Sequence, residues 1–262
     1  MTRFLVAAAL AASALATPAS AAVKTKQIDY DAGGTKLQGF LAWNDAQKGK
    51  HPGVLVVHEW WGHNEHARNQ AKRLAEAGYV AFALDMYGKG KLATHPKDAQ
   101  AFAAEATKDP ATVKARFDTA LGILKSQPQV DPERIGVVGY CMGGGIALAM
   151  ARAGEDLDAV AVFHAPLAPR SAPAQPGQVK AKILAQEGGK DPMIPPEQVK
   201  AFEDEMKNAG VDARVIVYPE AKHSFTNPNA GKAGMDALAY DPKADKESFR
   251  AALDFFGKTL GK

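Results

Sequence analysis

One cysteine stands in a setting typical of a catalytic nucleophile. Cys141 is the only cysteine of the chain and lies in the segment Gly139-Tyr140-Cys141-Met142-Gly143. An apolar run at 135–138 precedes this segment, and a helix-forming run at 146–150 follows it. Small residues on both sides let a strand and a helix meet in a sharp turn that lifts the nucleophile above the sheet. The helix start also favours negative charge, first on a thiolate and later on an oxyanion. The pattern predicts a nucleophilic Cys141, with a buried structural thiol as the alternative.

Two residues further along the chain could complete a catalytic triad. Asp191 follows a predicted strand that ends near Gln186, and His223 follows one that ends at Tyr218. A histidine can accept the thiol proton, and a carboxylate can orient the imidazole and stabilise its cation. Taken singly, an aspartate beside glycine and proline is often only a turn residue. Because the order nucleophile, acid, histidine is typical of hydrolases built on open sheets, we expect Cys141, Asp191 and His223 to act together.

A nearby segment invites comparison with a zinc site. His58-Glu59-Trp60-Trp61-Gly62-His63 resembles the motif H-E-x-x-H, and His66 follows. The second histidine comes one residue too late, and the segment leaves a strand for a loop where the motif needs a helix. We therefore predict no metal site. We also predict no cofactor, since neither G-x-G-x-x-G nor a P-loop occurs at the elbow. A zinc hydrolase using His58, His63 and His66 remains an alternative.

The elements that must position these residues alternate between strand and helix. Residues 23–30 and 36–43 predict an antiparallel hairpin with a turn at Gly33-Gly34. Later apolar runs alternate with helical patterns, which is typical of parallel strands joined by helical crossovers. The expected fold class is α/β, a mainly parallel sheet with helices on both faces and an N-terminal hairpin. In such sheets the functional residues lie beyond the carboxyl ends of the strands. The strands are expected at 53–58, 79–84, 134–140, 159–164, 182–186 and 214–218, and the helices at 65–77, 113–124, 142–153, 197–209 and 249–260.

The start of the chain resembles a signal peptide. Arg3 precedes an apolar run at 4–16, and an A-x-A cleavage site follows at 19–21. The apolar run is roughly 13 residues, shorter than the about 20 that a membrane span needs. We expect residues 1–21 to be removed, with residues 22–262 forming one domain without a membrane anchor. The protein is then exported, either periplasmic or secreted.

Charge and composition restrict the partners. Lysine and arginine number 32 against 29 acidic residues, a net charge of +3, and the two signs are interleaved. No basic run supports nucleic-acid binding. We expect a monomer that acts on a small molecule.

Several segments together resemble the dienelactone hydrolase family, a branch of the α/β-hydrolases, over essentially the whole mature length. These segments are the initial hairpin, His58-Glu59-Trp60-Trp61-Gly62, Asp85-Met86-Tyr87, the elbow with Gly144, Lys190-Asp191-Pro192 and His223-Ser224-Phe225.

This resemblance implies an α/β-hydrolase fold and a Cys141, Asp191, His223 triad that hydrolyses a lactone or ester through a thioester acyl-enzyme. It also implies that Glu59 takes part in activating the thiol. The oxyanion hole would be formed by the backbone N–H groups of Met142 and Trp60.

Two positions depart from the family pattern. Dienelactone hydrolases bind a substrate carboxylate with arginines, and the matching places here hold Lys89, or another nearby lysine, and Asn227. The carboxylate-bearing dienelactone is therefore not the expected substrate. The pocket should instead contain aromatic residues suited to an apolar ester. Its predicted substrate-binding residues are Trp61, Tyr87, Lys89, Ser224, Phe225 and Asn227, beside Trp60.

Two further alternatives stay open. The aromatic residues could simply pack the loops onto the sheet. The protein could also be a noncatalytic or redox-sensing binding protein with the hydrolase scaffold, in which Cys141 is oxidised to a sulfenic acid or a mixed disulfide.

Overall fold

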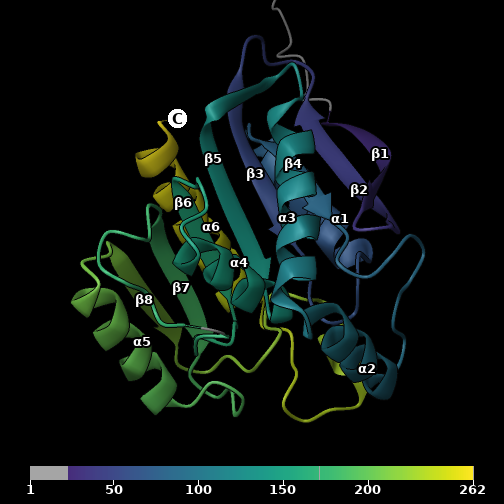
Figure 1. The fold of residues 1–262 in the computed structure, drawn as a ribbon. Helices are drawn as coiled ribbons and strands as arrows, with labels where there is room; N and C mark the ends of the chain where they lie inside the picture. The colour runs from purple at the N-terminus through teal and green to yellow at the C-terminus, as the bar shows by residue number, and fades with distance from the viewer. Residues whose placement is uncertain (1–22, 171, 262) are drawn as a thin grey trace, which may run out of the picture.

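The computed structural model describes residues 23–170 and 172–261. Within them, eight strands form one sheet in the order β1-β2-β4-β3-β5-β6-β7-β8 (Figure 1). The predicted signal peptide at residues 1–21 lies outside the described residues. The strands are β1 (Val23–Ala32), β2 (Thr35–Asn44), β3 (His51–Val57), β4 (Val80–Leu84), β5 (Val130–Tyr140), β6 (Ala159–Phe163), β7 (Lys182–Gly188) and β8 (Ala213–Tyr218).

The pairing of the strands confirms the predicted fold class. β1 and β2 form the antiparallel hairpin, β2 runs antiparallel to β4, and every other neighbouring pair is parallel. The helices are α1 (Glu65–Glu76), α2 (Pro96–Thr107), α3 (Pro110–Lys125), α4 (Met142–Arg152), α5 (Pro196–Asn208) and α6 (Pro242–Leu260), with a 3-10 turn at Ala230–Ala233. Among the described residues, none of the helices is both long and apolar enough to cross a membrane.

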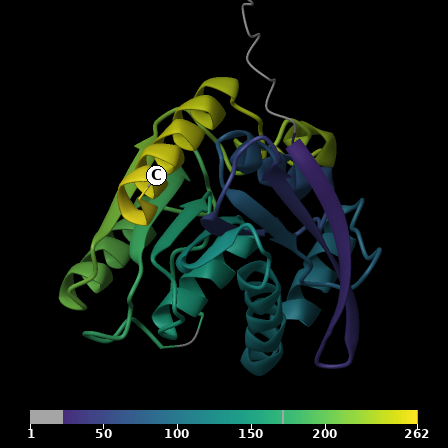
Figure 2. The ribbon, with the colours of Figure 1, turned by 90° about the horizontal axis from the view of Figure 1, so that it is seen from above.

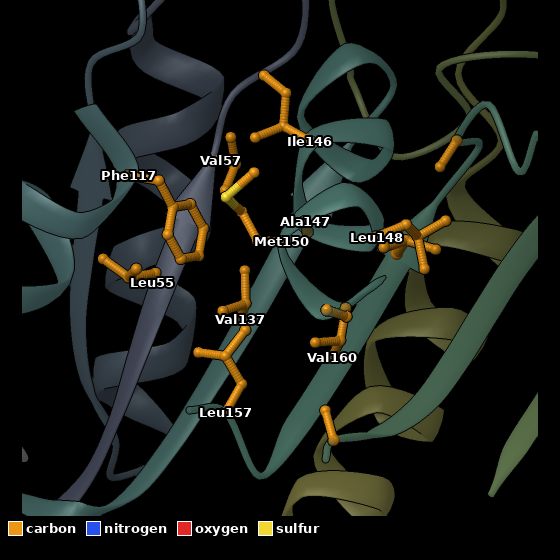
Figure 3. Packing of buried hydrophobic residues seen from close by; sticks show 14 of the residues in the cluster. Leu55, Val57, Phe117, Val137, Ile146, Ala147, Leu148, Met150, Leu157 and Val160 are labelled. Atoms are coloured by element: carbon orange, nitrogen blue, oxygen red, sulfur yellow. The ribbon is translucent and has the colours of Figure 1, made fainter. Parts of the chain in front are cut away.

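Alternate residues of the central strands face two separate hydrophobic layers. Leu55, Val57 and Val137 pack on one face, where α2, α3, α4 and α5 lie. Figure 3 shows this layer, with Phe117 of α3 and Ile146 of α4 over the strands. The alternate residues of the same strands, which point to the other face, pack against α1 and α6. Seen from above, α3 and α6 lie on opposite sides of the sheet (Figure 2). Successive residues of a strand point to opposite faces, and both faces are buried here. The sequences of these strands are therefore continuous apolar runs.

Three elements differ from the sequence prediction, and one of them is α6, which begins at Pro242 instead of residue 249. The helix α2 was not predicted, because its Ala-rich sequence buries only Ala99 and Ala106 and so shows little amphipathic contrast. The strand β5 begins at Val130 instead of Arg134, since Val130 and Asp131 pair with His51 and Pro52 of β3 before a register shift at Pro52/Gly53.

The order of the strands gives the position of the site. The chain passes from β3 to β4 on one side of β3 and then crosses to β5 on the other side, so the sheet has a switch point between β3 and β5. Ligands of open α/β sheets bind in the crevice at the carboxyl ends of such strands. Glu59 follows β3 there, and Cys141 follows β5.

Candidate active site

The elbow holds Cys141 in a strained conformation at the start of α4. Its backbone has φ 50° and ψ −121°, and its N–H donates to the carbonyl of Phe163 at 3.0 Å. A positive φ costs energy for a residue other than glycine and persists only when the surroundings impose it. A Cβ on Gly143 would overlap the carbonyl of Val57, and one on Gly139 would lie 2.5 Å from the carbonyl oxygen of Gly143. The glycines therefore allow α4 to lie close enough to the sheet to impose this turn.

Asp191 and His223 meet as the spacing predicted. The Nδ1 of His223 and the Oδ2 of Asp191 are 2.7 Å apart. The other oxygen, Oδ1, accepts the backbone N–H of Met193 at 2.8 Å, which fixes the carboxylate in its turn. Both side chains are buried, with His223 only 2% exposed. The second ring nitrogen, Nε2, is buried and has no partner of hydrogen-bond geometry among the described residues.

The electrostatics of His223 couple this ring to Asp191 and Cys141. Burial alone would lower the pKa of His223. The charge of Cys141 and the hydrogen bond to Asp191 outweigh burial and raise the pKa of His223 well above its ordinary value. An imidazole with a raised pKa beside a thiol favours a thiolate–imidazolium pair, the nucleophilic form of cysteine.

Glu59 is buried near the triad and bound by two predicted pocket residues. Ser224 donates its hydroxyl to Oε1 of Glu59 at 2.7 Å, and the amide of Asn227 donates to Oε2 at 2.6 Å. All three side chains are at most 3% exposed. The structure thus uses Ser224 and Asn227 to satisfy a buried carboxylate, where the sequence predicted that they bind substrate.

Two other predicted pocket residues lie elsewhere. Lys89 pairs with Asp29 of the hairpin at 2.5 Å, on an exposed surface. Phe225 is fully buried and packs against the rings of His164 and Tyr218. Each side chain is held by a tertiary neighbour that the sequence pattern does not reveal, and their contact with substrate stays a prediction.

The remaining aromatic residues gather near the elbow. The hydroxyl of Tyr87 donates to the carbonyl of Trp60 at 2.8 Å and lies 3.3 Å from the sulfur of Met142. Trp60 and Trp61 are half-buried, and their rings meet edge to face at 5.0 Å. The N–H of Met142 is the first of α4, where helix geometry leaves it free for an oxyanion.

The three histidines of the zinc alternative are not arranged as ligands. His58 has both ring nitrogens engaged, Nδ1 with the carbonyl of Glu59 at 2.5 Å and Nε2 with the N–H of Met86 at 3.1 Å. Across residues 23–170 and 172–261, no three His, Cys, Asp or Glu side chains are grouped as a metal site requires.

Sequence reasoning missed two buried polar groups beside the triad. The ring of His164 lies 5.0 Å from that of His223 and contacts the hydroxyl of Thr226 at 2.9 Å. Glu187 accepts the N–H of Ala165 at 3.2 Å, and burial raises its pKa well above the usual range. Both residues end apolar strands, where nothing in the local pattern distinguishes them from core residues.

Comparisons with known proteins agree with the geometry. The sequence pattern of the dienelactone hydrolase family matches residues 37–260. The protein usf of Aquifex pyrophilus is 29% identical over 240 residues, covering 90% of this chain and 99% of that protein. A protein of Aquifex aeolicus strain VF5, provisionally named a carboxymethylenebutenolidase, is 29% identical over 236 residues, covering 88% of this chain and 97% of that protein.

Solved structures extend the likeness to the fold. The crystal structure of P91, a dienelactone hydrolase-like promiscuous phosphotriesterase from metagenomic libraries, superposes with a TM-score of 0.87 at 34% identity, covering 92% of this chain and all of that one. The structure m3DLH superposes with a TM-score of 0.86 at 37% identity, covering 91% of this chain and 99% of that one. All the site residues described above lie within the matched range.

Proposed function

Because this chain belongs to the dienelactone hydrolase family and is a hydrolase, we propose that it cleaves a lactone or small carboxylic ester through a Cys-His-Asp triad. The observation that carries the proposal is His223, which lies between Asp191 and the elbow cysteine, with its pKa raised by both. This is the arrangement that cysteine nucleophiles need.

The reaction follows from these positions. The sulfur of Cys141 attacks the carbonyl carbon, and the N–H groups of Met142 and Trp60 stabilise the oxyanion. The C–O bond then breaks, and the imidazolium of His223 gives its proton to the departing oxygen. Water attacks the resulting thioester, with His223 accepting its proton, and the C–S bond breaks to release the acid and restore the thiol.

Glu59 is proposed to take part in activating the thiol. In the described structure both of its oxygens accept hydrogen bonds, from Ser224 and Asn227. An activation step therefore requires Glu59 to exchange one of these donors when substrate enters.

Export is proposed on the sequence alone. The charged start, apolar run and A-x-A site of residues 1–21 support a periplasmic or secreted protein. Expression in a bacterium followed by osmotic shock should release the protein with its N-terminus at Ala22. Retention in the cytoplasm with residues 1–21 intact would contradict export.

The catalytic proposal is tested with purified protein and p-nitrophenyl acetate. Cys141→Ala should lose at least about 10³-fold in kcat/KM, because the covalent step is gone. Cys141→Ser keeps the shape of the elbow and should also be strongly impaired. Equal turnover by wild type and Cys141→Ala would contradict the proposal. Rapid oxidation of Cys141 without ester turnover would favour the redox-sensing alternative.

A further inference from the structure

A guanidinium lies against the first turn of α4, on a loop that the family motifs do not include. Arg170 belongs to the Pro-rich segment that follows β6. Its Nε lies 3.2 Å, and its Nη2 3.5 Å, from the point that a Cβ on Gly145 would occupy. Gly145 is in the first turn of α4, and its N–H donates to the carbonyl of Cys141 at 3.2 Å. The cation of Arg170 therefore rests against the helical turn that carries the nucleophile.

Within the part of the chain that the structure describes, no acidic side chain forms an ion pair with this cation. None of the ion pairs formed among the described residues includes Arg170. Arg152 on the same side of the sheet shows the contrast, because its Nε bonds to Glu205 at 2.7 Å. Partial burial lowers the pKa of Arg170, and electrostatic interaction with Cys141 and Tyr87 opposes that effect. Both of these groups belong to the candidate site.

The position of Arg170 also makes it available to a ligand. The residue is exposed to solvent, so an incoming molecule can reach it, while Gly145 leaves space for its side chain to lie flat on α4. A guanidinium binds planar anions such as carboxylates through two parallel hydrogen bonds. The two positions that sequence reasoning considered for this task are occupied otherwise, Lys89 by Asp29 and Asn227 by Glu59.

We propose that Arg170 is a specificity-determining residue, which binds an anionic group carried by the ester or lactone substrate while Cys141 attacks the carbonyl. The inference rests on the proposed function and names the substrate class of the same site. A cation on this loop selects esters with a negative charge on either the acyl part or the leaving group, without taking part in bond breaking.

The test compares matched neutral and anionic esters. p-Nitrophenyl acetate and mono-p-nitrophenyl glutarate share a leaving group and differ in the charge of the acyl part. Methyl 4-acetoxybenzoate and 4-acetoxybenzoate share an acyl group and differ in the charge of the leaving group. For at least one anionic ester, Arg170→Gln should raise KM about 10- to 100-fold, as expected for loss of a charge-assisted hydrogen bond. Its neutral counterpart should keep its kcat/KM.

Three further variants act as controls. Arg170→Lys keeps the charge but not the planar fork, and it should fall between wild type and Arg170→Gln for the same ester. Lys200→Gln removes a cation that the structure places on the surface of α5 with Asp204, and it should leave all four esters unchanged. Lys89→Gln tests the rival cation, which pairs with Asp29, and it should not show the selective loss. Raising the salt concentration should increase KM of wild type for the anionic ester and have a smaller effect on Arg170→Gln.

Three results would overturn the inference. The neutral and anionic esters could lose activity equally in Arg170→Gln, which would mean that Arg170 acts on the nucleophile or the fold. The kinetics of both ester pairs could stay unchanged in Arg170→Gln, which would mean that Arg170 is only a solvated surface cation. Lys89→Gln could show the selective loss in place of Arg170→Gln. None of these would remove the dependence of neutral ester hydrolysis on Cys141, so they are distinct from failure of the proposed function.

Discussion

At the scale of single residues, the site depends on how His223 is shared between two neighbours. Asp191 bonds to one ring nitrogen at 2.7 Å, and the charge of Cys141 raises the pKa of the ring. Burial by itself would favour the neutral imidazole, so the raised pKa of His223 depends on its partners. This dependence can be measured one partner at a time.

Replacing Cys141 with alanine should lower the pKa of His223. The charge of Cys141 raises this pKa, and its loss leaves Asp191 alone to oppose burial. The measurement is an NMR titration of the imidazole resonances of wild type and Cys141→Ala. Cys141→Ser is the matched control, because a hydroxyl stays neutral where a thiol can ionise, and it should give a pKa near that of Cys141→Ala. An unchanged pKa would mean that Cys141 and His223 do not interact.

The sequence could predict the positions of Cys141, Asp191 and His223, but not the contacts of the side chains around them. Cys141, Asp191 and His223 each follow a strand, and in a parallel sheet strand order alone brings such positions together. Lys89, Asn227 and Phe225 were predicted to bind substrate only from their positions in the sequence. Contacts with residues distant in sequence, such as that of Lys89 with Asp29, determine where their side chains lie. Such contacts are visible only in the three-dimensional structure.

At the scale of elements, the contact between β5 and α4 determines the geometry of the elbow. The close approach of α4 to the sheet requires glycine at positions 139 and 143. A Cβ added to Gly139 would overlap the carbonyl of Gly143, and one added to Gly143 would overlap the carbonyl of Val57. Local pattern was sufficient to predict this unit, since the apolar strand, the glycines and the helix-forming run are contiguous. It was insufficient for α2, whose alanines carry no clear apolar stripe.

Gly143→Ala should therefore impair both folding and activity, because its methyl group would overlap backbone atoms that cannot rotate away. We expect a loss of about 1–3 kcal/mol or more in the free energy of unfolding, as for overpacked sites. Gly122→Ala is the matched control, since Gly122 lies in α3 with nothing within 4 Å of its added Cβ. That variant should gain about 0.5–1 kcal/mol from helix propensity. Urea denaturation measures both values, and equal stability of the two variants would contradict the close approach.

At the scale of the whole molecule, buried histidines connect the fold to pH. The pKa values of His58, His63, His66 and His164 are lowered by burial, that of His63 to about 3. Below pH 6.5 the unfolded chain binds protons at these positions that the folded chain does not. The free energy of unfolding should therefore fall as the pH decreases, by up to about 1.4 kcal/mol per pH unit for each histidine.

Two other groups, His223 and Glu187, affect the free energy of unfolding differently. Between pH 6.5 and pH 5, neither of them makes the folded protein less stable as the pH falls. The raised pKa of His223 contributes stability that is complete below pH 6.5 and lost as the pH rises through the folded value. The raised pKa of Glu187 favours folding as the pH falls toward 4.5. One such carboxyl does not offset four histidines, so the net effect of acidification is destabilising.

Urea denaturation at pH 6.5 and pH 5 tests this expectation. Wild type should be less stable at pH 5, and His63→Asn should show a smaller difference between the two pH values. A free energy of unfolding that stays constant between these pH values would contradict the buried neutral histidines.

The central claim is that Cys141 carries the acyl group, and trapping the intermediate tests it most directly. p-Nitrophenyl acetate is mixed with the protein, the reaction is stopped with acid within one turnover, and the digested peptides are weighed by mass spectrometry. The account predicts one acetyl group on Cys141, appearing and decaying at rates that match turnover. Hydrolysis that proceeds without acylation of Cys141, or with the acetyl group on another residue such as Ser224, would contradict it.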